Sequence, residues 1–260
     1  MMKEKLTIVK VGGKILEESE SLNLLLDEFS AIEGSKLLVH GGGRTATKLA
    51  SDLGIETRMV EGRRITDTSM LRVVTMVYGG LVNKDVVARL NARGVRALGL
   101  TGADMDVIRS HRRTGTAIDY GFVGDVDRVD AEVLVMLLKG GITPVMAPLT
   151  HDGQGTMLNT NADTIASQTA QALAKAFDVS LVYCFEKKGV LTNPDDDDSV
   201  VAHINSSLYD MLKAEGAIQG GMIPKLDNSF AALRKGVSKV VITKVGQLTQ
   251  PDAGTTITLE

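Results

Sequence analysis

Short runs of β-branched and aliphatic residues alternate along this chain with segments whose apolar positions recur at helical spacing. Residues 6–11 form one such run and predict a buried strand, and the apolar positions of 22–32 lie on one face of a helix. Residues 37–40 predict a second strand. The helix expected after it has three inward apolar residues and a terminal glycine, Ala46, Leu49, Leu53 and Gly54.

The middle and end of the chain repeat one arrangement, in which a helix ends in a basic residue plus glycine and leads at once into a strand. Glycine accepts the left-handed conformation that closes a helix, and the cation suits the negative end of the helix dipole. This alternation predicts right-handed crossovers and a mostly parallel open sheet. We therefore expect an α/β fold, a three-layer α/β/α sandwich. The junctions are Arg93-Gly94 before 95–100, Lys139-Gly140 before 142–147, and Lys235-Gly236 before 239–243.

Two segments interrupt this pattern. Residues 108–126 change to short polar–apolar alternation, which predicts a hairpin that leaves the main sheet. Asn193-Pro194 and the aspartates 195–198 make the clearest break, which we interpret as a solvent-facing surface turn rather than a metal site. Because no Pro/Ser-rich linker occurs, we predict a single domain over 1–260 with two lobes, about 1–178 and about 179–260.

Composition narrows the class of protein. With 43% hydrophobic and 23% charged residues the chain resembles an ordinary globular protein. A net charge of −3 without a long basic stretch argues against nucleic-acid or anionic-membrane partners. No apolar run approaches the ~20 residues of a membrane span. The single cysteine, Cys184, excludes an intrachain disulfide and favours a reducing, cytoplasmic setting.

Glycine clusters follow two early strands, in Lys10-Val11-Gly12-Gly13 and in His40-Gly41-Gly42-Gly43-Arg44. Neither a P-loop motif nor a Gly-x-Gly-x-x-Gly fingerprint occurs. Consecutive glycines let backbone N–H groups approach an anion, and the following helix N-terminus adds a positive dipole end. Tight turns alone would also explain a single Gly-Gly pair. Two clusters, each flanked by a cation, favour an anion site at the carboxyl ends of the strands.

Three further stretches carry polar chemistry. Arg64, beside Arg63, could hold a carboxylate with two parallel hydrogen bonds, although a solvated basic turn is the alternative. Residues 159–163 begin a predicted helix, where Asn and Asp could simply act as caps. That helix should turn Ile165, Thr169, Leu173 and Ala176 inward. Lys225 lies near another helix start, where its charge opposes the dipole unless an anion binds there.

Together these motifs resemble the amino acid kinase family, and within it the acylglutamate kinases. The resemblance runs from Lys10 to the last strand. It rests on Lys10-Val-Gly-Gly, His40-Gly-Gly-Gly, Gly62-Arg-Arg-Ile-Thr, Asn83-Lys84, Gly121-Phe-Val-Gly, Asn159-Thr-Asn-Ala-Asp, Gly189-Val-Leu-Thr and Gly221-Met-Ile-Pro-Lys.

The resemblance implies a kinase that transfers a phosphoryl group from ATP to the γ-carboxylate of an N-acylated glutamate. Lys10 and Lys225 would neutralise the transferring and leaving phosphates, and Asp163 would hold both ammonium groups. A carboxylate acceptor is already ionised at pH 7, so no general base is needed. Mg²⁺ would be carried by the ATP phosphates rather than by a protein cage.

The resemblance also implies the binding residues. The substrate would be held in the N-lobe by Gly42, Gly43, Arg64 and Asn159. The nucleotide would be held by Gly12, Gly13, Glu186, Lys188, Gly189, Leu191, Ile218 and Gln219.

The sequence departs from the family in two places. Relatives usually have an Asp-Val-x-Gly turn where this chain has Glu186-Lys187-Lys188-Gly189, so an acid persists there with a longer side chain and two extra cations. In addition, arginine-inhibited relatives carry an extra N-terminal helix that builds a hexamer. Because this chain starts almost directly in its first strand, we expect a homodimer without arginine feedback.

The acyl group is left open by the sequence. Acetyl is the default of the family, and the hairpin 108–126 should enclose it together with the segment around Arg64. A larger acyl group such as succinyl would need another cation, for which Arg109, Arg112 and Arg113 are candidates. Two alternatives remain, an aminoadipate-type kinase and a nucleotide-binding regulator without turnover. A mere binder would not need Lys10, Asp163 and Lys225 together.

Overall fold

A central sheet of eight strands organises the computed structural model, which describes residues 3–60, 62–193, 195–218, 222–250 and 252–260. The strand order is β12-β14-β13-β11-β1-β2-β8-β5. All neighbours from β13 to β5 pair in parallel, and β14 runs antiparallel to β13. Their bounds are β1 Lys5–Val11, β2 Ser35–His40, β5 Ala97–Leu100, β8 Thr143–Met146, β11 Asp178–Phe185, β12 His203–Ile204, β13 Lys239–Lys244 and β14 Thr255–Ile257.

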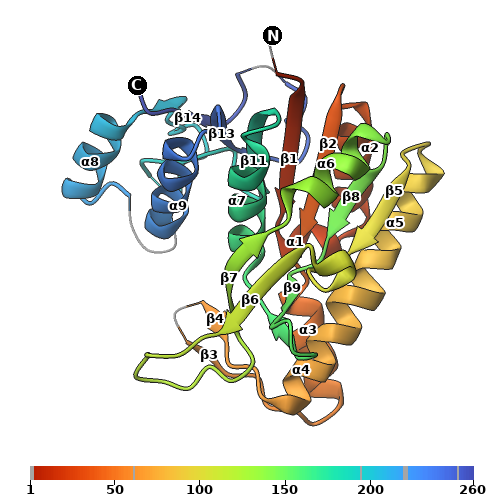
Figure 1. Ribbon diagram of the computed structural model, residues 1–260. Helices are drawn as coiled ribbons and strands as arrows, with labels where there is room; N and C mark the ends of the chain where they lie inside the picture. The colour runs from red at the N-terminus through yellow and green to blue at the C-terminus, as the bar shows by residue number, and fades with distance from the viewer. Residues whose placement is uncertain (1–2, 61, 194, 219–221, 251) are drawn as a thin grey trace.

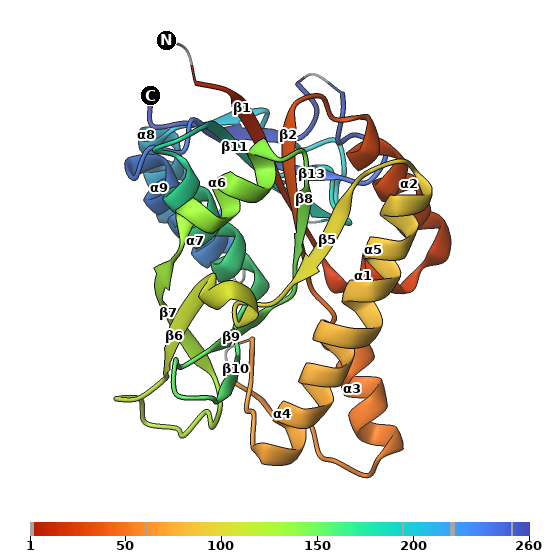
Figure 2. The ribbon, with the colours of Figure 1, turned by 45° about the vertical axis from the view of Figure 1, so that its right-hand side comes forward.

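Helices cover both faces of this sheet, and Figure 2 shows the three layers. One face packs against α6 Ala131–Lys139, α7 Ala162–Leu173 and α9 Met222–Arg234, with α8 Ser206–Ala214 outside them. The other face packs against α1 Gly13–Glu17, α2 Ser19–Ala31 and α5 Asn83–Ala92. The fold is thus the predicted α/β/α sandwich.

Side-chain alternation along β1 decides what faces each layer. Leu6 and Ile8 join the core beneath α6, α7 and α9, whereas Val9 and Val11 join the core beneath α2 and α5. Because successive strand residues point to opposite faces, Lys10 follows Leu6 and Ile8 toward α7. The strand pattern therefore puts a charged side chain at the carboxyl end of an apolar row.

The predicted hairpin is present as β6 Ile108–Arg112 and β7 Gly124–Val129, which pair antiparallel. It belongs to a separate four-stranded sheet of order β10-β9-β6-β7, with β9 Leu149–His151 and β10 Met157–Asn159. This second sheet lies below the carboxyl ends of the central strands in Figure 1. The sequence did not predict β9 and β10.

A long helical segment runs beside the second sheet. It consists of α4 Thr68–Val74, a π-helix (labelled η1) at Thr75–Val82, and α5. Its apolar side packs with α3 Gly43–Asp52 to form a third cluster of buried residues. Two short elements complete the fold, the strand pair β3 Met59–Val60 and β4 Arg63–Arg64, and a 3-10 turn at Asp104–Asp106.

Three local expectations were wrong. Leu53 is 55% exposed because α3 ends at Asp52 and Leu53 is already its cap. Ala176 is exposed because it lies beyond the end of α7. The left-handed residue after α6 is Gly141, with φ 71°, whereas Gly140 keeps a negative φ. The division into two lobes near residue 178 stays a prediction. β11 begins at residue 178 and pairs with β1 along seven residues, so the central sheet continues across this position.

Candidate active site

Lys10, Asp163 and Lys225 come together at the carboxyl end of β1. The Lys10 Nζ lies 2.7 Å from Asp163 Oδ1, and the Lys225 Nζ lies 3.2 Å from Asp163 Oδ2. Asp163 occupies the first turn of α7, and Lys225 occupies the first turn of α9. The predicted contact of one carboxylate with both lysines is present.

The local sequence explains how Asp163 reaches that position. Asn161 caps α7, since its Oδ1 accepts from the backbone N–H groups of Asp163 and Thr164 at 2.8 and 3.2 Å. The capping role that the sequence left open thus belongs to Asn161. Asp163 is spared that role, and its carboxylate faces the lysines.

Burial makes this cluster electrostatically sensitive. Lys10 is 7% exposed, and desolvation lowers the pKa of its ammonium, with the Lys225 charge acting in the same direction and Asp163 opposing both. Burial pushes the pKa of Asp163 upward, but the charges of Lys10 and Lys225 outweigh it and keep that pKa below its ordinary value. Asp163 therefore stays ionised beside the two lysines, and its charge opposes the loss of the proton from Lys10.

The two glycine loops lie against each other. A Cβ on Gly13 would sit 3.9 Å from the amide nitrogens of both Gly42 and Gly43. Gly42 has φ 146°, and a Cβ there would lie 2.9 Å from Cδ1 of Tyr78. Glycine is required at this position by both backbone conformation and space. The N–H groups of the two loops thus lie side by side ahead of α1 and α3.

His40 holds the second glycine loop, residues 41–43, through a hydrogen bond to Gly41. It is fully buried, its Nδ1–H donates to the carbonyl of Gly41 at 2.7 Å, and its Nε2 accepts from Asn83 Nδ2 at 3.0 Å. Asn83 also donates to the carbonyl of Val145 at 2.9 Å. Burial lowers the pKa of His40 to about 4. The imidazole is therefore neutral near pH 7, with its proton on Nδ1.

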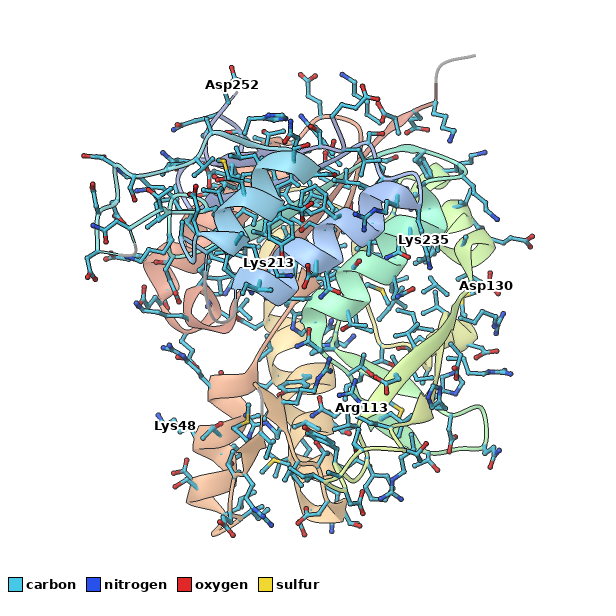
Figure 3. All side chains as sticks on the ribbon, turned by 90° about the vertical axis from the view of Figure 1, so that its left-hand side faces the viewer. Lys48, Arg113, Asp130, Lys213, Lys235 and Asp252 are labelled. Carbon is cyan, nitrogen blue, oxygen red and sulfur yellow. The ribbon has the colours of Figure 1, made fainter. Side chains whose placement is uncertain are left out.

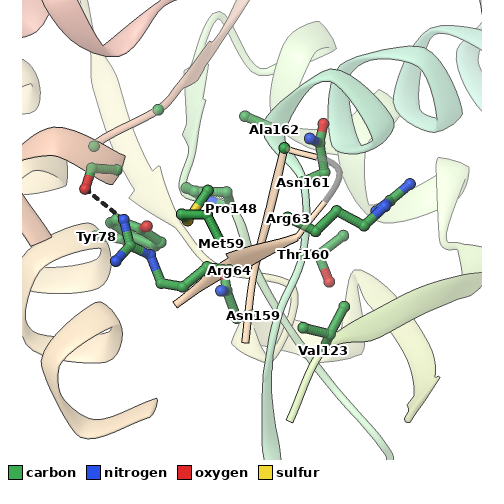
Figure 4. A pocket seen from close by; sticks show the side chains of 14 residues that line it. Met59, Arg63, Arg64, Tyr78, Val123, Pro148, Asn159, Thr160, Asn161 and Ala162 are labelled. Atoms are coloured by element: carbon green, nitrogen blue, oxygen red, sulfur yellow. Dashed lines mark hydrogen bonds between the residues drawn. The ribbon is translucent and has the colours of Figure 1, made fainter. Parts of the chain in front are cut away.

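A cavity of about 190 Å³ opens beside these loops. Figure 4 shows Arg64 turned toward Tyr78, and Arg63, its neighbour on β4, turned to the opposite side. The cavity is lined by Gly41, Gly42, Gly43, Met59, Gly62, Arg63, Arg64, Tyr78, Val123, Pro148, Asn159, Thr160, Asn161 and Ala162.

Two predicted substrate-binding side chains are buried at this cavity. Arg64 donates to the carbonyl of Gly43 at 2.7 Å and to Thr47 Oγ1 at 2.8 Å, so it also fixes the glycine loop. Asn159 donates to Thr66 Oγ1 at 2.9 Å. Arg63 and Thr160 belong to the predicted motifs but were given no role of their own, and Tyr78 was not singled out from the sequence. Tyr78 in particular stands in an apolar helical stretch that gave no sign of its place at the cavity.

Val123, which directly precedes β7 of the predicted hairpin, lines one side of the cavity. Phe122 N–H donates to the carbonyl of Thr66 at 2.6 Å, and Asn159 N–H donates to the carbonyl of Phe122 at 2.8 Å. The hairpin and the segment that follows Arg64 are therefore joined through backbone hydrogen bonds. The expectation that both enclose the acyl group stays a prediction.

The three hairpin arginines have other contacts. Arg109 donates to Asp106 at 3.2 Å, Arg112 to the carbonyl of Gly121 at 2.6 Å, and Arg113 to Asp125 at 2.9 Å. Figure 3 shows Arg113 below Lys213, which lies on α8, and below Lys235, which follows the end of α9. Among the described residues that line the cavity, the cations are Arg63 and Arg64.

A second cavity, of about 290 Å³, lies on the α9 side and contains part of the predicted nucleotide set. Gly189, Leu191 and Ile218 line it. Glu186 instead lines a cavity with Lys14 and Lys244, and Lys188 pairs with Asp198 at 2.9 Å. Gln219 lies outside the described residues. The structure thus gathers the apolar members of the predicted set and separates the charged ones.

Within the ranges that the structure describes, three or more His, Cys, Asp or Glu side chains nowhere gather in a way that could hold a metal ion.

The chain matches the model of the amino acid kinase family over residues 5–244. It belongs to the amino acid kinase family. Among family members, it is 65% identical to a protein of Bacteroides fragilis named acetylglutamate kinase, with 98% of each chain covered.

Solved structures agree in fold. The structure of smu.665 from Streptococcus mutans matches with a TM-score of 0.78 and 27% identity, over 98% of this chain and 99% of that one. An N-acetylglutamate synthase from Neisseria gonorrhoeae, solved with coenzyme A and N-acetyl-glutamate, matches with a TM-score of 0.84 and 22% identity. That match covers this whole chain and 60% of the synthase, and shows that the amino acid kinase fold is shared.

Proposed function

We propose that this protein is an acetylglutamate kinase, which phosphorylates the γ-carboxylate of N-acetyl-L-glutamate with ATP in arginine biosynthesis. The observation that carries this function is the Lys10–Asp163–Lys225 cluster beside two touching glycine loops. The 65% identity to the Bacteroides fragilis enzyme supports the choice of substrate.

The reaction forms a bond between a γ-carboxylate oxygen and the γ-phosphorus of ATP and breaks the bond from that phosphorus to the β-γ bridging oxygen, which leaves on ADP. No proton has to move, because the acceptor carboxylate is ionised at pH 7. Catalysis then consists of positioning and charge stabilisation. Lys10 and Lys225 stabilise the transferring and leaving phosphates, and Asp163 holds their ammonium groups. Mg²⁺ on the ATP phosphates supplies further charge neutralisation when bound.

For the substrate, we assign the N–H groups of Gly42 and Gly43 to the reacting end. Arg64 binds the α-carboxylate, and Asn159 contacts a further polar group. Tyr78 and Val123 line the same cavity and would contact the apolar parts of the acid. A cavity of about 190 Å³ suits a small acid better than a large ligand.

For the nucleotide, Gly12 and Gly13 would approach the phosphates. The cavity lined by Gly189, Leu191 and Ile218 would take the adenine, since it is mostly apolar. From the turn before Gly189, the exposed Glu186 would contact the nucleotide directly, and Lys188 would do so once it leaves Asp198.

At the level of the whole molecule we propose a cytoplasmic homodimer. Met76 and Leu81 are 52% and 62% exposed on the long helical segment, and such apolar side chains would be buried by a second copy. None of the helices in the described residues is long and apolar enough to cross a membrane. Light scattering of the purified protein measures its mass, and a monomer at micromolar concentration would contradict the homodimer.

The deciding experiment is ATP-dependent acyl-phosphate formation trapped with hydroxylamine. N-acetylglutamate, N-succinylglutamate, glutamate and aminoadipate are compared as acceptors. Highest kcat/KM with N-acetylglutamate is expected. Absence of turnover with every acylglutamate would refute the function. A higher kcat/KM with N-succinylglutamate would identify succinyl as the acyl group and place it beside Arg63.

A further inference from the structure

Phe185, the last residue of β11, lies against both lysines of the cluster. The Lys10 Nζ is 4.8 Å from the centre of its ring, and the Lys225 Nζ is 4.0 Å from it. Both distances lie within the ~6 Å at which a ring attracts a cation through its quadrupole. One aromatic ring is thus shared by two ammonium groups that also share one carboxylate.

The strand register explains the position of this ring. Lys10 on β1 is opposite Tyr183 on β11, and Phe185 follows two residues later on the same face. The rings of Tyr183 and Phe185 stack, with centroids 6.1 Å apart and planes inclined by 6°. The Phe185 Cδ1 also lies 3.5 Å from where a Cβ of Gly12 would be. The ring is therefore fixed between the lysines and the first glycine loop.

The charges of the cluster do not balance, and the ring can compensate for part of the difference. Asp163 carries one negative charge against two ammonium groups, which repel each other across the site. Burial acts most strongly against the charge of Lys10, and the Lys225 ammonium acts in the same direction. The Cys184 thiol, also close to Lys10, stays neutral because burial raises its pKa to about 12. A second carboxylate would restore neutrality, but it would also repel the ATP phosphates. A ring attracts cations without net charge, and it leaves their N–H donors available.

We propose that Phe185 is a positioning residue whose ring holds the ammonium groups of Lys10 and Lys225 charged and close together, where the phosphoryl group is transferred. This inference rests on the proposed function, because that function assigns the two lysines to catalysis. It assigns to Phe185 an electrostatic role beyond that of an apolar strand residue.

Three variants test the proposal. Phe185→Leu keeps an apolar side chain of similar size and removes the ring, whereas Phe185→Tyr keeps the ring. Phe29→Leu is the matched control, because Phe29 is a buried phenylalanine with the Lys36 Nζ 5.7 Å from its ring centre, on the opposite face of the sheet.

Phe185→Leu is expected to lower kcat roughly tenfold, in line with the strength of a desolvated cation–ring contact. The alkaline limb of its kcat–pH profile should move to lower pH, since loss of the ring disfavours the protonated lysines. Phe185→Tyr should retain kcat and the alkaline limb, and Phe29→Leu should lower thermal stability without moving that limb. An unmoved limb in Phe185→Leu, or an equal loss in Phe185→Leu and Phe185→Tyr, would overturn the proposal.

A second measurement separates this inference from the proposed function. The rate at which an acylating reagent modifies Lys10, followed by peptide mass spectrometry across pH, reports its protonation without turnover. In Phe185→Leu this modification should begin at lower pH than in the wild type. An unchanged onset would refute the role of the ring, whereas failure of the wild type to phosphorylate any acylglutamate would refute only the proposed function.

Discussion

At the scale of single residues, Asp163 is the carboxylate that pairs with both lysines of the candidate site. Asp163→Asn leaves the two lysines facing each other without their carboxylate. We expect kcat to fall at least about a hundredfold, with a smaller change in the KM for ATP, because the loss concerns charge stabilisation during transfer. Steady-state kinetics measures this.

Asp125→Asn is the control for that variant, since Asp125 pairs with Arg113 away from the lysines. It should keep kcat within about threefold, as expected for a partly exposed ion pair. A wild-type kcat in Asp163→Asn would show that Asp163 does not organise the site.

His40 makes a prediction about pH and stability. Its pKa is about 4 in the folded protein and 6.5 as an ordinary histidine, so the unfolded chain binds the proton more readily between these values. The contribution to stability is complete above pH 6.5 and is lost as the pH falls toward 4, by about 3 kcal/mol in total. Urea unfolding of the wild type at pH 7 and pH 4.5 measures this loss.

His40→Gln should show less of that decline, so that its stability approaches that of the wild type as the pH falls. The exposed His203, replaced by Gln, serves as the control and should leave the pH dependence unchanged. A parallel decline in the wild type and His40→Gln would contradict the assignment to His40.

The resemblance to the family predicted the contact between Lys10, Asp163 and Lys225. From the residue pattern, Lys225 stood out because its charge opposes a helix dipole, whereas Asp163 could have been an ordinary cap. Tyr78 could not be selected, because an aromatic residue in an apolar helical stretch has the same pattern whether it faces the core or a cavity. Its role depends on the approach of Gly42, which only the fold provides.

At the scale of elements, the second glycine loop and the π-helix fit together. Gly42→Ala would force a Cβ against the Tyr78 ring at a φ that L-residues rarely adopt. We expect a loss of about 1–3 kcal/mol in the free energy of unfolding. The KM for the acid should also rise at least about tenfold, because the loop N–H groups would move.

Gly80→Ala is the matched control, since Gly80 lies in the same π-helix and nothing occupies the space of its Cβ within 4 Å. It should change neither quantity noticeably. If Gly42→Ala behaved like Gly80→Ala, the loop would have room that the structure does not show.

Long elements with clear periodicity were predicted, whereas short or irregular ones were not. The strands β9 and β10 have three residues each, too few for alternation to stand out. The π-helix has the same apolar pattern as an α-helix, because the change of hydrogen-bond register leaves no mark in residue types. The hairpin β6–β7 was found because its polar–apolar alternation breaks the surrounding pattern.

At the scale of the whole molecule, the candidate active site is assembled from distant parts of the chain. Lys10 stands near the N-terminus and Lys225 on α9, and Asp163 links them from α7. Lys10→Ala and Lys225→Ala should each lower kcat at least about a hundredfold. The double variant should lose much less than the product of the two, because residues that act as a unit are not additive. Strictly multiplicative losses would show that the lysines act independently.

The overall architecture followed from the sequence because strand–helix alternation admits few topologies. The order of the strands did not follow, since β11 reaches the centre of the sheet from late in the chain. The pairing of β1 with β11 brings Phe185 beside Lys10, and no local sequence pattern predicts this pairing. The pairing of strands that are distant in the chain is therefore the feature of the site that only the three-dimensional structure reveals.

The contact between the two glycine loops has a consequence for protein engineering and for divergence within the family. Since the backbone of Gly13 meets the amides of Gly42 and Gly43, neither loop can be lengthened or exchanged without disturbing the other. Chimeras that take β1 with its loop from one relative and β2 with its loop from another should lose activity even when both parents are active. The two segments should be transplanted, and inherited, as a pair.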